Sequence, residues 1–316
     1  MERLGWCWAA LSGRLVVMIR LLGVLFLCVG SLAGGEPPVR GVFNTVMELH
    51  RYAGCRLSPE PWADGDSFSV EFPDGTKQTI RLYGVDCLET TGDDETDARR
   101  LRAQRRYFGI SGFGGNARAS NDMAKEFGRG AKVAVEKLLE QPFTVRTAWS
   151  DARGSSKYKR YYGFVETATE GDLAEILVKR GMARAFGVYR RGPAGTAADY
   201  RERLGDLELK AAKTGAGVWA LTDWDKLPDE RKAERDEEAE LEAAKDRRLE
   251  PGEKIDPNTA SRDELMNLPG IGEKKAHAII EERENGKYRR PEDMARVSGI
   301  GGKTVERLRP FLKFGP

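Results

Sequence analysis

The chain has 316 residues, enough for two modest domains, and 32% of them are charged. Its 52 lysines and arginines nearly balance 50 aspartates and glutamates, so the net charge of +2 does not by itself mark a nucleic-acid binder. The two histidines, His50 and His277, lie in different segments. This separation argues against a histidine-rich zinc site and against a Ser-His-Asp triad.

The N-terminus has the pattern of an export signal. Basic residues precede an apolar run over residues 21–29, and small residues follow up to Ala33. The run is shorter than the roughly 20 residues that span a membrane. We therefore expect residues 1–33 to be a signal peptide cleaved near Ala33, which gives a secreted or periplasmic protein. An uncleaved membrane anchor is the alternative. Residues 34–57 are expected to form an N-terminal extension.

Residues 58–222 have the pattern of a small domain rich in β-strands. Phe68, Val70 and Phe72 alternate with small or polar residues, which predicts a half-buried strand, and residues 73–75 predict a hairpin turn. Further strands are expected at 79–85, 143–149 and 158–166, and helices at 131–139 and 173–179. Short strands with glycine-rich turns and a few helices favour a small barrel.

Three motifs in this domain supply the charges that phosphodiester hydrolysis needs. They are Asp64-Gly65-Asp66, the stretch from Arg81 to Glu89, and Lys157-Tyr158-Lys159-Arg160. Two carboxylates can hold a hard divalent cation, a third can orient or deprotonate a water, and two arginines can brace a phosphate. In a regular strand Arg81 and Asp86 would face opposite sides, so the strand must bend near Gly84.

In content and order these motifs resemble those of the staphylococcal nuclease (thermonuclease) family over residues 62–219. The resemblance implies an α+β domain with an OB-type five-stranded β-barrel and packed helices. It also implies attack of water on phosphorus, with cleavage of the 5′ P–O bond and 3′-phosphate products. The roles that it implies are calcium binding by Asp66, Asp86 and the Cys87 carbonyl, catalysis by Arg81, Glu89 and Arg160, and nucleotide contact by Lys157, Tyr158 and Tyr189. Whether Glu89 removes the proton or orients the water stays open.

The sequence departs from the family pattern at four positions. Ser67, Leu88, Lys159 and Gly187 stand where the family has threonine, proline, glycine and tyrosine. The first three leave the chemical groups in place, since Ser67 keeps the hydroxyl. The last bears on substrate affinity, because the family's tyrosine helps to hold the terminal phosphate.

Residues 89–127 form a longer connection than the family has at this place. A run of arginines between Arg99 and Arg106 is followed by Tyr107-Phe108 and a glycine-rich segment. Two interpretations stay open. One is a solvated helix followed by a mobile loop. The other is a surface that binds single-stranded nucleic acid through phosphate pairing and base stacking.

Residues 223–252 are dense in acidic and basic residues and contain no aromatic residue after Trp224. We expect a charged linker, either a solvated helix or a disordered spacer. A full helix of this length would separate the flanking modules by about 30–40 Å.

Residues 253–316 contain an internal repeat, since Gly270-Ile271-Gly272 and Gly299-Ile300-Gly301 each precede a helix start. They resemble the tandem helix-hairpin-helix module of the competence-type DNA receptor family, which implies a small all-α domain that binds DNA. Glycines let backbone N–H groups approach a phosphate. The expected backbone contacts are Gly270, Gly272, Lys274, Lys275, Gly299, Gly301 and Lys303. A protein-binding helical domain whose glycines only make turns is the alternative.

Cys55 and Cys87 would remain in the mature protein after signal cleavage. An even pair in an exported chain permits a disulfide. Their spacing alone leaves both a disulfide and two free thiols open.

Together these features predict an exported, calcium-dependent nuclease whose C-terminal module holds DNA through its backbone. DNA is the expected substrate and RNA a second one. We expect a monomer that needs Ca²⁺ and no small-molecule cofactor. The alternative is a non-catalytic DNA-binding or DNA-uptake protein that uses the barrel only as a platform. The complete set of carboxylates and arginines favours the enzyme.

Overall fold

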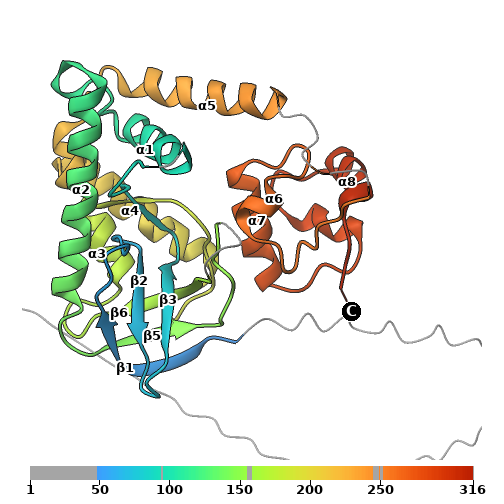
Figure 1. Ribbon diagram of the computed structural model, residues 1–316, viewed down its shortest axis with the longest axis horizontal. Coiled ribbons are helices and arrows are strands. Elements are labelled where there is room, and N and C mark those ends of the chain that lie inside the picture. Colours follow the sequence, from blue (N-terminus) through green and yellow to red (C-terminus); the bar gives the residue numbers. More distant parts are fainter. Residues whose placement is uncertain (1–47, 94, 155–158, 245–248, 250–251, 316) are drawn as a thin grey trace, which may run out of the picture. The chain divides into compact units, whose positions relative to one another are not determined.

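The computed structural model describes residues 48–93, 95–154, 159–244, 249 and 252–315. Five strands close into a barrel in the order β1-β2-β3-β6-β5 (Figure 1). Neighbouring strands pair antiparallel, except for β3 and β6, which are parallel. The bounds are β1 His50–Ser58, β2 Ser67–Glu71, β3 Lys77–Leu82, β5 Phe143–Thr147 and β6 Tyr161–Glu166. The expected OB-type barrel with packed helices and a helical C-terminal region is confirmed.

The barrel begins earlier in the chain than the sequence indicated. β1 lies largely within residues 34–57, which were expected to precede the domain, yet it pairs with both β2 and β5. Only Cys55 and Ser58 of this strand are buried. Because it lacks an alternating apolar face, the pattern that marks the other strands does not mark this one.

The predicted bend near Gly84 is present. β3 ends at Leu82, Gly84 has a φ of 71°, and the chain then enters β4 (Val85–Cys87). β4 leaves the barrel and pairs with β7 (Ala183–Ala185) in a separate two-stranded sheet. A Cβ at Gly84 would lie 2.7 Å from Leu204 Cδ1, so both the backbone angle and the packing favour glycine here.

Helices cover the barrel and carry their own capping residues. The Asn116 side chain accepts a hydrogen bond from the Ala119 N–H at the start of α2, and Asp172 does the same for Glu175 in α3. Ala131 of α2 joins the barrel core. The helices of this region are α1 Glu95–Phe108, η1 Phe113–Gly115, α2 Ala117–Leu138, α3 Leu173–Lys179, α4 Ala197–Thr214 and η2 Gly217–Leu221.

The long connection after Glu89 is packed rather than fully solvated. It forms α1 and the start of α2, and both Leu101 and Phe108 are buried. The ring of Phe108 lies 4.9 Å from that of Trp219, edge to face. Phe108 is therefore part of a core and is not available for base stacking, whereas binding of single-stranded nucleic acid by the arginines of this connection stays a prediction.

The charged stretch expected as a spacer forms α5 (Leu227–Ala244), which packs against α1. Arg102 of α1 pairs with Glu237 at 2.5 Å, and Arg106 pairs with Glu234 at 2.8 Å. This packing could not be predicted from the sequence, because α5 has few apolar residues and its partners lie more than a hundred positions away.

The C-terminal module is all helical. Its elements are α6 Arg262–Leu265, α7 Glu273–Glu284, η3 Pro291–Arg296, α8 Gly302–Leu308 and η4 Arg309–Phe311. Leu265, Ile279 and Leu308 are fully buried, and these side chains belong to the same contiguous core as the barrel interior.

Buried polar contacts join the module to the barrel. The Tyr83 hydroxyl donates to Glu284 at 3.2 Å, and Arg190 pairs with the same carboxylate. At the backbone, the Arg262 N–H donates to the Arg153 carbonyl at 3.2 Å. The module is thus docked on the nuclease-like domain through specific hydrogen bonds.

The expected signal peptide lies outside the described residues. Within the residues that are described, none of the helices is both long enough and apolar enough to cross a membrane.

Candidate active site

The first motif builds a fixed turn around Asp66. Asp64 Oδ1 accepts hydrogen bonds from the N–H groups of Asp66 and Ser67, at 2.9 and 2.6 Å. This places Asp66, which is 2% exposed, so that its Oδ2 accepts from the Cys87 N–H at 2.6 Å. Asp64 therefore shapes the loop, and Asp66 ties the first motif to the second.

Arg81 bridges the two carboxylates predicted to bind calcium. It pairs with Asp66 and, at 3.0 Å, with Asp86. Burial raises the pKa of Asp66 well above its usual value despite Arg81. Burial would also raise the pKa of Asp86. The positive charges of Arg184 and Arg81 outweigh this effect and hold the pKa of Asp86 below its usual value.

Arg184 was not identified from the sequence. The antiparallel register of β4 and β7 sets it directly opposite Asp86, and its Nε donates to Asp86 Oδ2 at 2.9 Å. Its guanidinium also lies 4.2 Å from the centre of the Phe186 ring. No local motif marks this arginine; only the strand pairing brings it to the site.

Gln104 of α1 is the second residue that sequence reasoning missed. Its Nε2 donates to Asp86 Oδ2 at 2.8 Å and to the Cys87 carbonyl at 2.7 Å, and its Oε1 accepts from the Glu89 N–H at 3.0 Å. Gln104 is 1% exposed. This one amide therefore positions three groups of the second motif, which gives the long connection a structural role at the site.

Glu89 lies beside the other carboxylates and close to Arg100. The Glu89 Oε1 to Arg100 Nη1 distance is 3.6 Å. Burial raises the pKa of Glu89 to about 7, although Arg100 acts in the opposite direction. A carboxylate with a pKa near neutrality is well suited to exchange a proton with water.

Arg160 lines a narrow cleft together with Arg81 and Asp86. It has no ion pair with any side chain in the described ranges. Burial lowers its pKa, and the neighbouring Arg81 and Arg100 lower it further. Four arginines, Arg81, Arg100, Arg160 and Arg262, line the cleft, whereas Asp86 is its one acidic side chain among the described residues. This excess of guanidinium groups favours an anion such as a phosphate.

The cleft is narrow. Its volume is about 20 Å³, which is room for roughly one water. A Cβ at Gly154 would lie 2.7 Å from Arg262 Nη2 and 3.1 Å from Arg160 Nη2, so these two guanidiniums converge over a glycine. A phosphate must therefore displace the long side chains that line the cleft.

The donor set agrees in kind with calcium, which prefers oxygen ligands. Asp66, Asp86 and the Cys87 carbonyl offer only oxygen ligands. The positive charge of a divalent cation would offset the cost of burying these carboxylates. Yet in this structure Arg81 and Gln104 engage those oxygens. No cluster of three or more Asp, Glu, His or Cys side chains close enough to hold a metal occurs among the residues described.

Three predicted nucleotide contacts remain untested. Lys157 and Tyr158 lie outside the described residues. Tyr189 is 7% exposed, and the Arg201 guanidinium lies 4.4 Å from the centre of its ring. Tyr189 is not among the residues that line the cleft, whereas Gly187 is.

The two hairpins of the C-terminal module have the expected backbone geometry. Gly270 and Gly299 have φ values of 78° and 82°. Gly272 and Gly301 are the N-cap residues of α7 and α8, and neither helix start has a side-chain cap. No side chain therefore competes with a phosphate for the N–H groups at these helix starts.

The lysines beside the hairpins differ in their surroundings. Lys274 and Lys303 are exposed. Lys275 instead donates from Nζ to the Gly270 carbonyl at 2.8 Å, so it stabilises the first hairpin. Its role in DNA contact stays a prediction.

Cys55 and Cys87 are both buried with free thiols. The Cys87 Sγ packs against Gly65, where an added Cβ would lie 2.7 Å away. In this structure Cys87 contributes to packing under the Asp66 turn.

A barrel with a cleft lined by arginines, followed by two glycine hairpins at uncapped helix starts, defines a protein of the nuclease and DNA-binding class. Comparison with known families agrees with both halves. Residues 79–221 match the family described as "Staphylococcal nuclease homologue", and residues 250–313 match the "Helix-hairpin-helix motif". The predicted combination of a staphylococcal-nuclease-like domain and a tandem hairpin module is confirmed.

Individual relatives match only short segments. The chain is 44% identical over 62 residues to "ComE operon protein 1" of Bacillus subtilis, which covers 19% of this chain and 30% of that protein. It is 41% identical over 58 residues to the human "Endonuclease/exonuclease/phosphatase family domain-containing protein 1", covering 18% and 10% of the two chains. The chain thus spans under a third of the length of each of these two relatives. The match to "ComE operon protein 1" fits a competence-type hairpin module.

Proposed function

We propose that this chain is an exported, calcium-dependent nuclease that hydrolyses phosphodiester bonds of DNA, and of RNA as a second substrate. The observation that carries the proposal is the meeting of Asp66, Asp86 and Glu89 with Arg81 and Arg160. These residues come from three motifs that lie far apart in the sequence, and the fold brings them to one place. Export rests on the signal pattern of residues 1–33.

In this proposal each side chain has a distinct task. Asp66, Asp86 and the Cys87 carbonyl would hold calcium, which when bound neutralises charge on the phosphate. Arg160 and Arg81 bind the non-bridging oxygens, where negative charge grows in the transition state. Glu89 orients the attacking water or accepts its proton.

The missed residues support this assignment. Gln104 fixes the loop that contains Asp86 and Glu89, and Arg184 keeps Asp86 ionised. A metal ligand must be ionised to bind a cation well. Arg81 would have to give up part of its contact with Asp66 and Asp86 when it binds a phosphate.

A second candidate function is a DNA-binding protein without catalysis. The observation in its favour is that Arg81, Arg184 and Gln104 already engage the oxygens of Asp86. Such a site could bind a phosphate without any metal. The two hairpins of the C-terminal module would serve either function.

Plasmid degradation in calcium or in a chelator separates these functions. We expect DNA hydrolysis in calcium, its loss in excess chelator, and its recovery when calcium is restored. Full activity in the chelator would contradict the calcium assignment. Retained DNA binding without hydrolysis under either condition would establish the non-catalytic function instead.

A further inference from the structure

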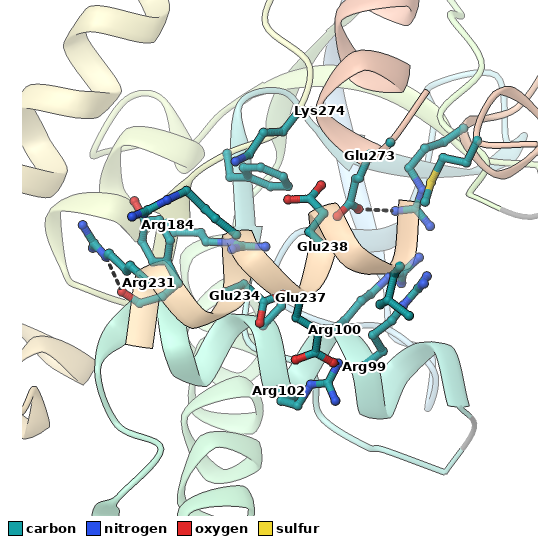
Figure 2. A pocket seen from close by; sticks show the side chains of 18 residues that line it. Arg99, Arg100, Arg102, Arg184, Arg231, Glu234, Glu237, Glu238, Glu273 and Lys274 are labelled. Carbon is teal, nitrogen blue, oxygen red and sulfur yellow. Dashed lines mark hydrogen bonds and ion pairs between the residues drawn. The ribbon is translucent and has the colours of Figure 1, made fainter. Parts of the chain in front are cut away.

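A second cavity, larger than the catalytic cleft, lies between α1, α5 and the start of α7. Its volume is about 350 Å³, within the range of pockets that bind small ligands, roughly 300–1,000 Å³. Figure 2 shows Lys274 and Glu273 of the C-terminal module on one side of it, and Arg99, Arg100 and Arg102 of α1 on the opposite side. Neither the family resemblance nor the proposed catalytic groups account for this space.

The lining of the cavity is strongly cationic. Eight arginine or lysine side chains face it against four glutamates. Three of these glutamates are already paired: Glu237 with Arg102, Glu234 with Arg106, and Glu273 with Arg262. The fourth, Glu238, is the acidic side chain of the described lining that has no such partner.

Three of the cations have no partner among the described residues. Arg99, Arg235 and Lys274 line the cavity from α1, α5 and α7, and none of them forms a hydrogen bond or ion pair with another described residue. All three are exposed. Positive charges brought together without counterions favour the binding of an anion.

Two arginines are shared by this cavity and the catalytic cleft. Arg100 and Arg262 line both spaces. Arg100 reaches Glu89 on the catalytic side, at 3.6 Å. Arg262 comes from the C-terminal module and lies near Arg160 over Gly154. The two spaces are therefore adjacent, and an extended ligand could occupy both.

The start of α7 adds a further feature. Gly272, its N-cap residue, lines the cavity, and no side chain caps the helix. The helix has 12 residues, so its N–H groups and dipole would favour a negative group here. The first hairpin of the module thus faces the same space as the unpaired cations.

We propose that this cavity binds a phosphate of the substrate strand next to the scissile one. The ligand is a single-stranded polynucleotide, because a pocket of this size, closed by helices on several sides, holds one strand and not a duplex. Arg100 and Arg262 link the two phosphate sites. The proposal rests on the proposed nuclease function and adds to it a subsite that the module and the nuclease-like domain build together.

The test compares two double variants that remove equal positive charge. In the cavity variant, Arg99→Ala and Arg235→Ala remove two unpaired cations that have no part in the hairpins. In the control variant, Arg118→Ala and Arg129→Ala remove two exposed cations of α2 that do not line the cavity. None of the four has an ion pair with a described residue, so both variants should fold.

The substrates are a dinucleotide, which has only the scissile phosphate, and a single-stranded decanucleotide. For the cavity variant we expect KM for the decanucleotide to rise about tenfold, on the scale expected when phosphate-binding cations are removed. Its kcat/KM for the dinucleotide should stay unchanged. The control variant should change either value less than about twofold. Equal effects of the two variants on the decanucleotide would overturn the proposal.

Binding in a chelator keeps this test separate from the proposed function. We expect Kd of a labelled decanucleotide, measured by fluorescence anisotropy, to rise about tenfold in the cavity variant only. The slope of log K against log salt should fall by about 0.7 for each phosphate that the variant no longer neutralises. If the wild-type protein binds but never hydrolyses DNA, the nuclease proposal fails while this comparison still decides the subsite. Equal Kd values for wild type and cavity variant would contradict it.

Discussion

The two hairpins of the C-terminal module share a sequence pattern but differ in what surrounds them. At the first, Gly272 and Lys274 line the cavity beside the cleft, together with residues of α1 and α5. At the second, a Cβ on Gly301 or Gly302 would meet nothing within 4 Å. One repeat faces the nuclease-like domain and the other faces open space.

This difference suggests distinct roles for the two repeats in the proposed function. An open hairpin can approach the backbone of a duplex from outside, and such contacts position a protein on DNA without reading its sequence. The first hairpin instead lines the cavity that adjoins the cleft. In this account the module would hold long DNA through its second hairpin and form one wall of the proposed substrate path through its first.

The first prediction tests the buried contact that joins the C-terminal module to the nuclease-like domain. Glu284 and Arg190 are 3% and 6% exposed, and Tyr83 donates to the same carboxylate. Breaking a buried pair costs about 3–5 kcal/mol. We expect Glu284→Gln to lower the free energy of unfolding in urea by at least ~3 kcal/mol.

The matched control is Glu281→Gln. Glu281 also joins the module to the other domain, through Arg201, but that arginine is 51% exposed. An exposed pair contributes about 0–1 kcal/mol. Similar losses in the two variants would mean that the buried contact does not hold the module in place.

The open hairpin offers a sharper test of duplex binding. Gly301 has a φ of −94° and free space around its missing Cβ, so Gly301→Val should fold. A valine there would keep a phosphate away from the helix start. We expect the Kd for a long duplex at moderate salt to rise about tenfold, with a shallower dependence on salt.

Gly130→Val on α2 is the control for this variant, because a Cβ there also meets nothing within 4 Å. Hydrolysis of a dinucleotide should be unchanged in both variants. If Gly301→Val binds duplex as tightly as wild type, the second hairpin does not contact DNA, and the protein-binding interpretation of the module gains support.

The sequence was sufficient for barrel strands β2, β3, β5 and β6, for the hairpin module and for the bend at Gly84, because motifs and alternating apolar residues mark them. It was not sufficient for β1, which has no alternating apolar face. It was not sufficient for Gln104, Arg184 or Arg262. Their roles arise from tertiary packing with residues distant in the chain, and a single side chain of that kind has no signature in one sequence. The packing of α5 was missed for a related reason, since ion pairs to α1 replace the apolar stripe that usually reveals a buried helix face.

The smallest expected effect concerns the pH dependence of the stability of the fold. Burial lowers the pKa of His277, which packs against Phe186 and lines the catalytic cleft, to about 4. The unfolded chain binds this proton near the usual pKa of about 6.5. Between these values the unfolded state holds more protons, so stability falls as pH falls from about 6.5 to 4.

We expect His277→Gln to reduce this loss of stability between pH 7 and pH 4, measured as the free energy of unfolding in urea. His50→Gln, at the exposed start of β1, serves as the control. Unchanged profiles in the His277 variant would show that this side chain does not contribute to the acid sensitivity of the fold.

The central claim is that Glu89 and its neighbours hydrolyse phosphodiester bonds, and single-turnover hydrolysis of a dinucleotide in saturating calcium tests it most directly. Glu89→Gln keeps the size of the side chain and removes its ability to accept a proton. We expect its rate to fall by at least ~10²-fold, while Glu140→Gln, an exposed glutamate after α2, keeps the wild-type rate. A near-normal rate in a folded Glu89→Gln protein would contradict the assignment of the site.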